Sequence, residues 1–141
     1  MTRAFTVTVV AAALASAMLA RTIEAPPPPS APLASVLELV RERESDLPVP
    51  AGFVVRDLGA RYGYYNPFTD RITVDDVFLA GADCARMQKL YEILVHEAWH
   101  RREPVRAVLA PWRHPHIDAA AAQRAALARP VIAACSDLEP G

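Results

Sequence analysis

The residues with the clearest chemistry in this sequence are the two histidines of the segment His96-Glu97-Ala98-Trp99-His100. On a helix, His96 and His100 project from the same face, one turn apart, because they are four residues apart. Two neutral imidazoles at that spacing can bind one zinc ion, and Glu97 at the edge of the face can reach a water molecule without binding the metal. The pattern is typical of zinc-dependent hydrolases, most often peptidases.

The sequence around this motif predicts a helix that begins after Asp83. Asp83 is a suitable N-cap, Arg101 and Arg102 suit a helix C-terminus, and Pro104 marks the end. Apolar residues recur upstream at helical spacing, which indicates one buried face. They are Met87, Leu90, Tyr91, Leu94 and Ala98. The alternative interpretation is an ordinary amphipathic helix that carries two histidines by chance.

A catalytic zinc ion needs a third protein ligand, which the motif does not supply. Residues 101–106 lack the continuation to a distant histidine that defines the metzincin class. Asp118, eighteen residues after His100 and at the start of the next predicted helix, is the first candidate ligand. His116 and His114 are the alternatives. Asp118 could instead serve only as a helix N-cap, a position that aspartate favours.

The rest of the chain predicts one small exported domain. Its 141 residues carry a net charge of −1, which offers no electrostatic case for binding nucleic acid. Residues 1–20 combine Arg3 with an apolar run and are predicted to be a cleaved signal peptide, with an uncleaved membrane anchor as the alternative. Proline-rich residues 21–34 are predicted to be an extended linker. The domain would therefore cover residues 35–141 and lie outside the cytoplasm, secreted, periplasmic or tethered to the membrane.

The predicted domain belongs to the α+β class. A first helix over residues 35–44 is followed by β-like sequence. The predicted strands are residues 53–55, 62–65 and 72–74. Residues 66–70 form a turn sequence, so we expect a short antiparallel hairpin or meander before the motif helix. An alanine-rich helix from about Asp118 to Ala128 follows.

Two cysteines allow one cross-link. Cys84 lies at the start of the motif helix and Cys135 near the C-terminus. In an oxidising compartment they could form a disulfide, and two free buried thiols are the alternative.

The order of these features resembles a minimal gluzincin-type metallopeptidase. The matching segments are the hairpin residues 63–65 and 71–74, the motif, and Asp118 at the head of an alanine-rich helix. Over roughly residues 60–130 the sequence is similar to the ImmA/IrrE-like metallopeptidases and to the mitochondrial inner-membrane metallopeptidase that processes an ATP synthase subunit. Those families usually carry glutamate in place of Asp118 and a small or apolar residue in place of Trp99.

The resemblance implies a zincin-like fold and a zinc endopeptidase that acts on a peptide or protein substrate. His96, His100 and Asp118 would hold Zn²⁺, and Glu97 would be the general base. The strand at residues 72–74 would lie beside the cleft and pair with the substrate backbone. A phenol that stabilises the reaction intermediate could come from Tyr62, Tyr64 or Tyr65. A non-catalytic zinc-binding domain and a metal-free exported interaction domain remain the alternative hypotheses.

Overall fold

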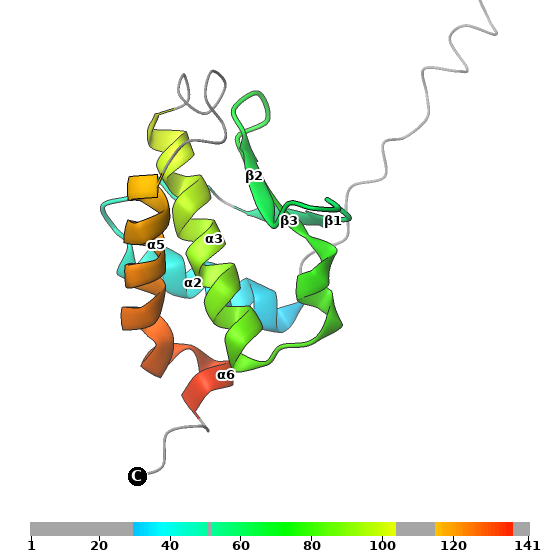
Figure 1. Cartoon of the computed structure of the whole chain (residues 1–141). Coiled ribbons are helices and arrows are strands. Elements are labelled where there is room, and N and C mark those ends of the chain that lie inside the picture. Colours follow the sequence, from blue (N-terminus) through cyan, green and yellow to red (C-terminus); the bar gives the residue numbers. More distant parts are fainter. Residues whose placement is uncertain (1–29, 51, 104–114, 137–141) are drawn as a thin grey trace, which may run out of the picture.

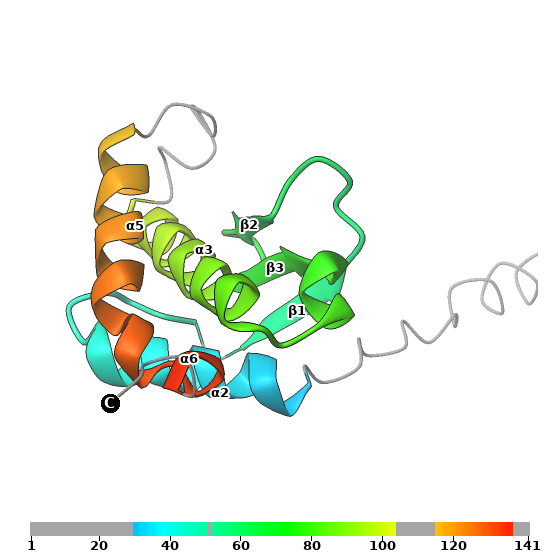
Figure 2. The same cartoon turned by 60° about the horizontal axis from the view of Figure 1, so that its bottom comes forward.

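Helix α3 (Cys84–Arg102) runs through the middle of the molecule, between α5 on one side and the sheet on the other (Figure 1 and Figure 2). The structure is a computed structural model, and it describes residues 30–50, 52–103 and 115–136. The other elements are α2 (Ala31–Arg43), β1 (Phe53–Arg56), β2 (Gly63–Asn66), β3 (Arg71–Asp75), the 3-10 helix η1 (Asp76–Ala80), α5 (Pro115–Ala128), the 3-10 turn η2 (Arg129–Val131) and α6 (Ala133–Ser136). The predicted α+β class is confirmed.

Helix α2 begins earlier than the sequence analysis predicted. Its first residue is Ala31 rather than Ser35, and Pro32 occupies the first turn, where its missing N–H removes no helical hydrogen bond. Leu33 is only 1% exposed and belongs to the core. The last four residues of the predicted linker, 31–34, are therefore part of the folded unit. The predicted signal segment and nearly all of the remaining linker lie outside the described residues.

The three strands form a mixed sheet in the order β1-β3-β2. Strands β2 and β3 pair antiparallel, with Tyr64 opposite Thr73, so the predicted hairpin is confirmed. Strand β1 pairs parallel to β3, with Val54 opposite Thr73. The prediction of a wholly antiparallel meander is therefore wrong, because β3 lies between its two predecessors.

Buried Asp75, at the end of β3, explains how the chain passes from β1 to β2. Its carboxylate accepts hydrogen bonds from the N–H groups of Leu58 at 2.8 Å and Val77 at 3.0 Å. Its own N–H donates to the carbonyl of Tyr62 at 2.9 Å. These bonds hold residues 57–62 around the end of β3. Stepping over one strand requires about 10 Å, which this loop easily spans.

The hydrophobic core surrounds α3. All five residues of its predicted apolar stripe are at most 1% exposed: Met87, Leu90, Tyr91, Leu94 and Ala98. Helix α5 packs along α3 with a buried face made mostly of alanine: Ile117, Ala121, Ala125 and Ala128. Within the described residues, we find no helix whose length and hydropathy would suit a membrane span.

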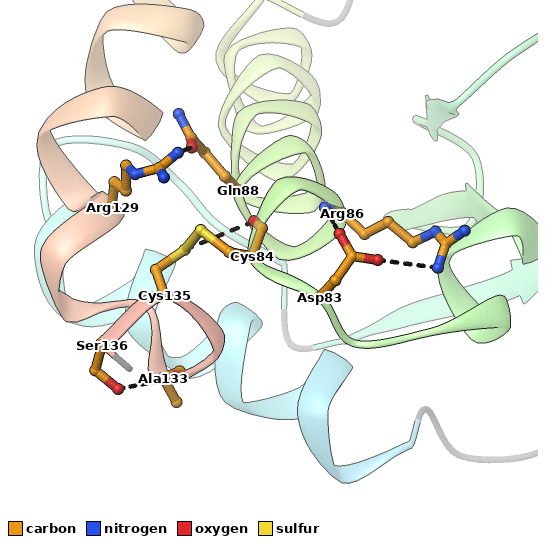
Figure 3. Close-up of a disulfide and its surroundings, with 8 residues drawn as sticks. All are labelled: Asp83, Cys84, Arg86, Gln88, Arg129, Ala133, Cys135 and Ser136. Carbon is orange, nitrogen blue, oxygen red and sulfur yellow. Dashed lines mark hydrogen bonds and ion pairs between the residues drawn. A yellow bond between two sulfur atoms is a disulfide. The ribbon is translucent and has the colours of Figure 1, made fainter. Parts of the chain in front are cut away.

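A disulfide joins the start of α3 to α6 (Figure 3). Cys84 and Cys135 are 51 residues apart in the sequence, and both are buried. Beside the bridge, the guanidinium of Arg129 donates to the side-chain oxygen of Gln88 at 3.0 Å. Of the two alternatives that the sequence left open, the structure shows the bridge.

Candidate metal centre

Helix α3 brings the two motif histidines together. The helix is capped as predicted: the side chain of Asp83 accepts a hydrogen bond from the N–H of Arg86 at 3.0 Å, and basic residues occupy its last turn. The Nε2 atoms of His96 and His100 lie 3.0 Å apart. The predicted helix and the predicted common face of the two histidines are therefore both confirmed.

The distance between the two Nε2 atoms suits a shared metal ion. Two nitrogens bound to zinc at about 2.05 Å in tetrahedral geometry lie roughly 3.3 Å apart. Together with Glu97, the two histidines form a group whose possible ligand atoms all lie within 4.8 Å of one another. Imidazole and carboxylate donors are the types that zinc commonly takes. His96, Glu97 and His100 could therefore hold a metal ion with little rearrangement.

Helix α5 brings Asp118 to the same place. The helix begins at Pro115, so Asp118 lies inside the first turn and is not the N-cap that the alternative interpretation required. One carboxylate oxygen lies 2.8 Å from Nδ1 of His96. This distance suits a hydrogen bond from Nδ1–H to the carboxylate, which would leave the lone pair of a neutral ring on Nε2, the nitrogen nearer His100. Asp118 does not belong to the group of described side chains that could share a metal, so direct ligation by Asp118 stays a prediction.

The two alternative ligands are placed differently. His116 lies in the first turn of α5, exposed to solvent, and it does not belong to the group of described side chains that could share a metal. His114 lies outside the described residues, together with the predicted connection that precedes it.

Glu97 is a buried carboxyl group in contact with the sheet. Its side chain is 6% exposed, and Oε2 accepts a hydrogen bond from the backbone N–H of Tyr65 at 2.7 Å. Burial raises the pKa of Glu97 to about 7, although the Tyr65 N–H lowers it; the negative charge of Asp118 adds a smaller upward contribution. A carboxyl group with a pKa near 7 can take up and release a proton at neutral pH, as a general base must.

Strand β2 forms the wall of the site opposite α3. A Cβ atom on Gly63 would lie 2.7 Å from Cγ2 of Ile93, so only glycine allows the strand to come this close to the helix. The prediction that residues 72–74 pair with a substrate is wrong, because β3 is paired on both sides. Among the described strands, β1 and β2 are the edge strands, and β2 is the one that lines the site. The glycine within residues 62–65 was the available signal for this close approach.

A cavity of about 340 Å³ lies between β2 and α3. Residues 61–65 line one wall, and the face of α3 from Lys89 through Ile93 to His100 lines the other, with Asp118 at the histidine end. The three predicted tyrosines all line it: Tyr62, Tyr64 and Tyr65. The hydroxyl of Tyr65 donates to Asp70 at 2.9 Å, and the ring of Tyr62 packs against Phe78 with centroids 6.4 Å apart.

Comparisons with protein-family models, with curated proteins and with solved structures found no match for this chain. The case for a function therefore depends on the geometry of the site.

Proposed function

We propose that this chain is a zinc-dependent metallopeptidase in which His96 and His100 hold the metal, Asp118 supports His96 through Nδ1, and Glu97 is the general base. The observation that best supports this is the convergence of three features in one cleft: two facing imidazole nitrogens, a buried carboxyl group and an open strand edge. A zinc ion bound there would supply a Lewis acid that polarises a carbonyl group and makes water nucleophilic near neutral pH.

The chain's own residues supply the proton transfer. Glu97 has a pKa of about 7, so near neutral pH its carboxylate can take a proton from water and return it to a leaving amine. The backbone N–H of Tyr65 holds this carboxylate at 2.7 Å and fixes its position at the edge of the histidine face. Asp118 orients the His96 ring through Nδ1.

The free edge of β2 supplies the means to hold a peptide. The N–H of Asp75 bonds to the carbonyl of Tyr62, so in an antiparallel ladder Tyr64 also bonds to β3, whereas Gly63 and Tyr65 turn their backbone groups outward. The Tyr65 N–H follows this pattern, because it points to Glu97. The Tyr65 N–H already donates to Glu97, so an extended peptide could add to β2 beside the metal site through the backbone groups of Gly63 and the carbonyl of Tyr65.

We also propose that the chain acts outside the cytoplasm, after export by its N-terminal segment. The disulfide between Cys84 and Cys135 supports this location, because disulfides persist in oxidising compartments.

The first experiment is the zinc stoichiometry of the purified protein beside His96→Ala, by elemental analysis. We expect about one zinc per chain, lost in the variant. The zinc-loaded protein is then incubated with a complex peptide mixture, and new peptide termini are compared with those from Glu97→Gln. Absence of zinc from a folded, zinc-supplied protein would refute the proposal. Zinc bound equally by both proteins, with no difference in cleavage, would indicate a non-catalytic zinc-binding domain.

A further inference from the structure

We infer that Arg124 is a positioning residue for the metal site, because its ion pairs with Glu44 and Asp46 set where α5 lies along α3 and so hold Asp118 beside His96. The inference rests on the proposed function, since it concerns the same metal site. It adds a residue far from the motif that neither the motif nor its spacing indicates.

The apolar contact between α5 and α3 does little to set their relative position along the helix axes. Three of the four residues on the buried face of α5 are alanines: Ala121, Ala125 and Ala128. Each presents a single methyl group, so the helices can approach closely but have few side chains that interdigitate. Displacing α5 by one turn, about 5.4 Å, would bring one small residue to the place of another. The disulfide and the Arg129–Gln88 hydrogen bond hold the segment after α5 against α3, and a directional interaction closer to Asp118 would fix the register further along α5.

Arg124 provides that interaction. Its guanidinium donates to the carboxylate of Glu44, which is 6% exposed at the end of α2, and forks onto both oxygens of Asp46 at 2.8 and 2.9 Å. Glu44 also accepts a hydrogen bond from the hydroxyl of buried Tyr91 in α3 at 2.5 Å. A planar guanidinium that serves two carboxylates is confined to a narrow range of positions and directions. These four residues, the Arg124 cluster, join α5 to α3 and to the segment after α2.

The same guanidinium contacts the turn of α3 that carries the motif. It lies 5.9 Å from the ring centroid of Trp99, the residue directly before His100, and Arg102 lies 5.4 Å from the same ring. The Trp99 ring gives α5 a second contact with α3 that depends on the place of Arg124.

Asp118 and Arg124 lie on the same helix, so the position of Arg124 affects the metal site. Asp118 lies six residues before Arg124, about 9 Å along the same helix, so the two move together when α5 shifts. The contact between Asp118 and Nδ1 of His96 is 2.8 Å, and N–H···O hydrogen bonds lie at about 2.7–3.2 Å. A shift of α5 that lengthens this contact by about 1 Å would remove the orienting bond from His96.

The test measures zinc affinity by competition with a chelator, which needs no substrate. We expect Arg124→Gln and Asp118→Asn each to weaken zinc binding about 10-fold or more, and the double variant to be no weaker than the worse single variant. The matched control is Arg129→Gln, which removes a side-chain hydrogen bond from an arginine of the C-terminal region to Gln88 of α3. The zinc affinity of this control should stay within about twofold of the wild-type value.

Asp46→Asn is a milder variant that controls for loss of folding. It removes one of the two hydrogen bonds between Asp46, whose side chain is 52% exposed, and Arg124, and it leaves the ion pair of Arg124 with Glu44 in place. It should weaken zinc binding in the same direction, with near-ultraviolet circular dichroism unchanged. Zinc affinity within twofold of wild type in both Arg124→Gln and Asp46→Asn, while Asp118→Asn is impaired, would overturn the inference. So would additive losses in the double variant. A wild-type protein that binds no zinc would instead refute the proposed function.

Discussion

Removing the disulfide should lower the free energy of unfolding by about 4 kcal/mol. The bridge joins residues 51 apart, and closing a loop of that length removes about 14 cal/mol/K of entropy from the unfolded chain. At 25 °C this corresponds to about 4 kcal/mol. The variant is Cys84→Ala combined with Cys135→Ala. Both side chains are at most 5% exposed, so alanine keeps the sites apolar and the main change is the lost cross-link. Small domains are stable by only about 5–15 kcal/mol, so the loss is a large fraction of the total.

Urea unfolding of the metal-free protein, followed by circular dichroism, measures this difference. With a urea dependence of 1–3 kcal/mol/M, the midpoint should fall by roughly 1.3–4 M. Wild type unfolded and refolded in reductant is the control and should show a similar decrease, because it loses the same bond without any substitution.

A loss below about 1 kcal/mol would refute this reasoning. It would mean that α6 stays beside the start of α3 in the unfolded ensemble even without the bond, so that the cross-link removes little freedom. A loss well above 5 kcal/mol would mean that the substitutions also disrupt the packing around the two sites.

Two further substitutions and a pH series test the site. Gly63→Ala should cost about 1–3 kcal/mol in urea unfolding, since its Cβ would lie 2.7 Å from Ile93, whereas Gly52→Ala, with no atom within 4 Å, should not; equal effects would contradict the close approach. Glu97→Gln should keep zinc but lower turnover at least 100-fold; unchanged turnover would exclude Glu97 as the base. The pKa of Glu97 is raised from 4.5 to about 7 in the folded protein. In the metal-free protein this shift contributes roughly 3 kcal/mol to the free energy of unfolding, which is fully present below about pH 4.5 and is lost as the pH rises to about 7. The free energy of unfolding should therefore change less with pH across this range in Glu97→Gln than in wild type. The same pH dependence in both proteins would contradict the burial of Glu97 as the cause of its raised pKa.

Local pattern was sufficient to predict the motif helix and the histidine pair. The apolar stripe of α3 has helical spacing, and its cap at Asp83 lies next to it in the sequence, so no distant contact is needed to recognise either. The hairpin turn at residues 66–70 is likewise local. The disulfide could be named as one of two outcomes, because pairing depends on the distance between α3 and α6 in space.

Features that depend on distant contacts were missed. The parallel place of β1 depends on backbone hydrogen bonds to the buried carboxylate of Asp75, which reads in the sequence only as an acidic residue after a strand. The early start of α2 depends on Leu33 entering the core beside a proline that looked like linker. The ion pairs of Arg124 are made with carboxylates 78 and 80 residues away. None of these partners has a spacing that marks it.

The place of β3 between two earlier strands has a consequence for the order in which a growing chain can fold. Synthesis from the N-terminus delivers β1 and β2 first, yet each finds its hydrogen-bonding partner only in β3, so neither ladder can form until residue 75 has emerged. Cys84 then waits for a partner 51 residues further on. Oxidation of this pair therefore cannot precede the emergence of Cys135, and an oxidant that acts on the nascent chain before then meets an unpaired thiol. The order of the chain thus makes all residues of the sheet and of α3 available to fold before the bridge can close.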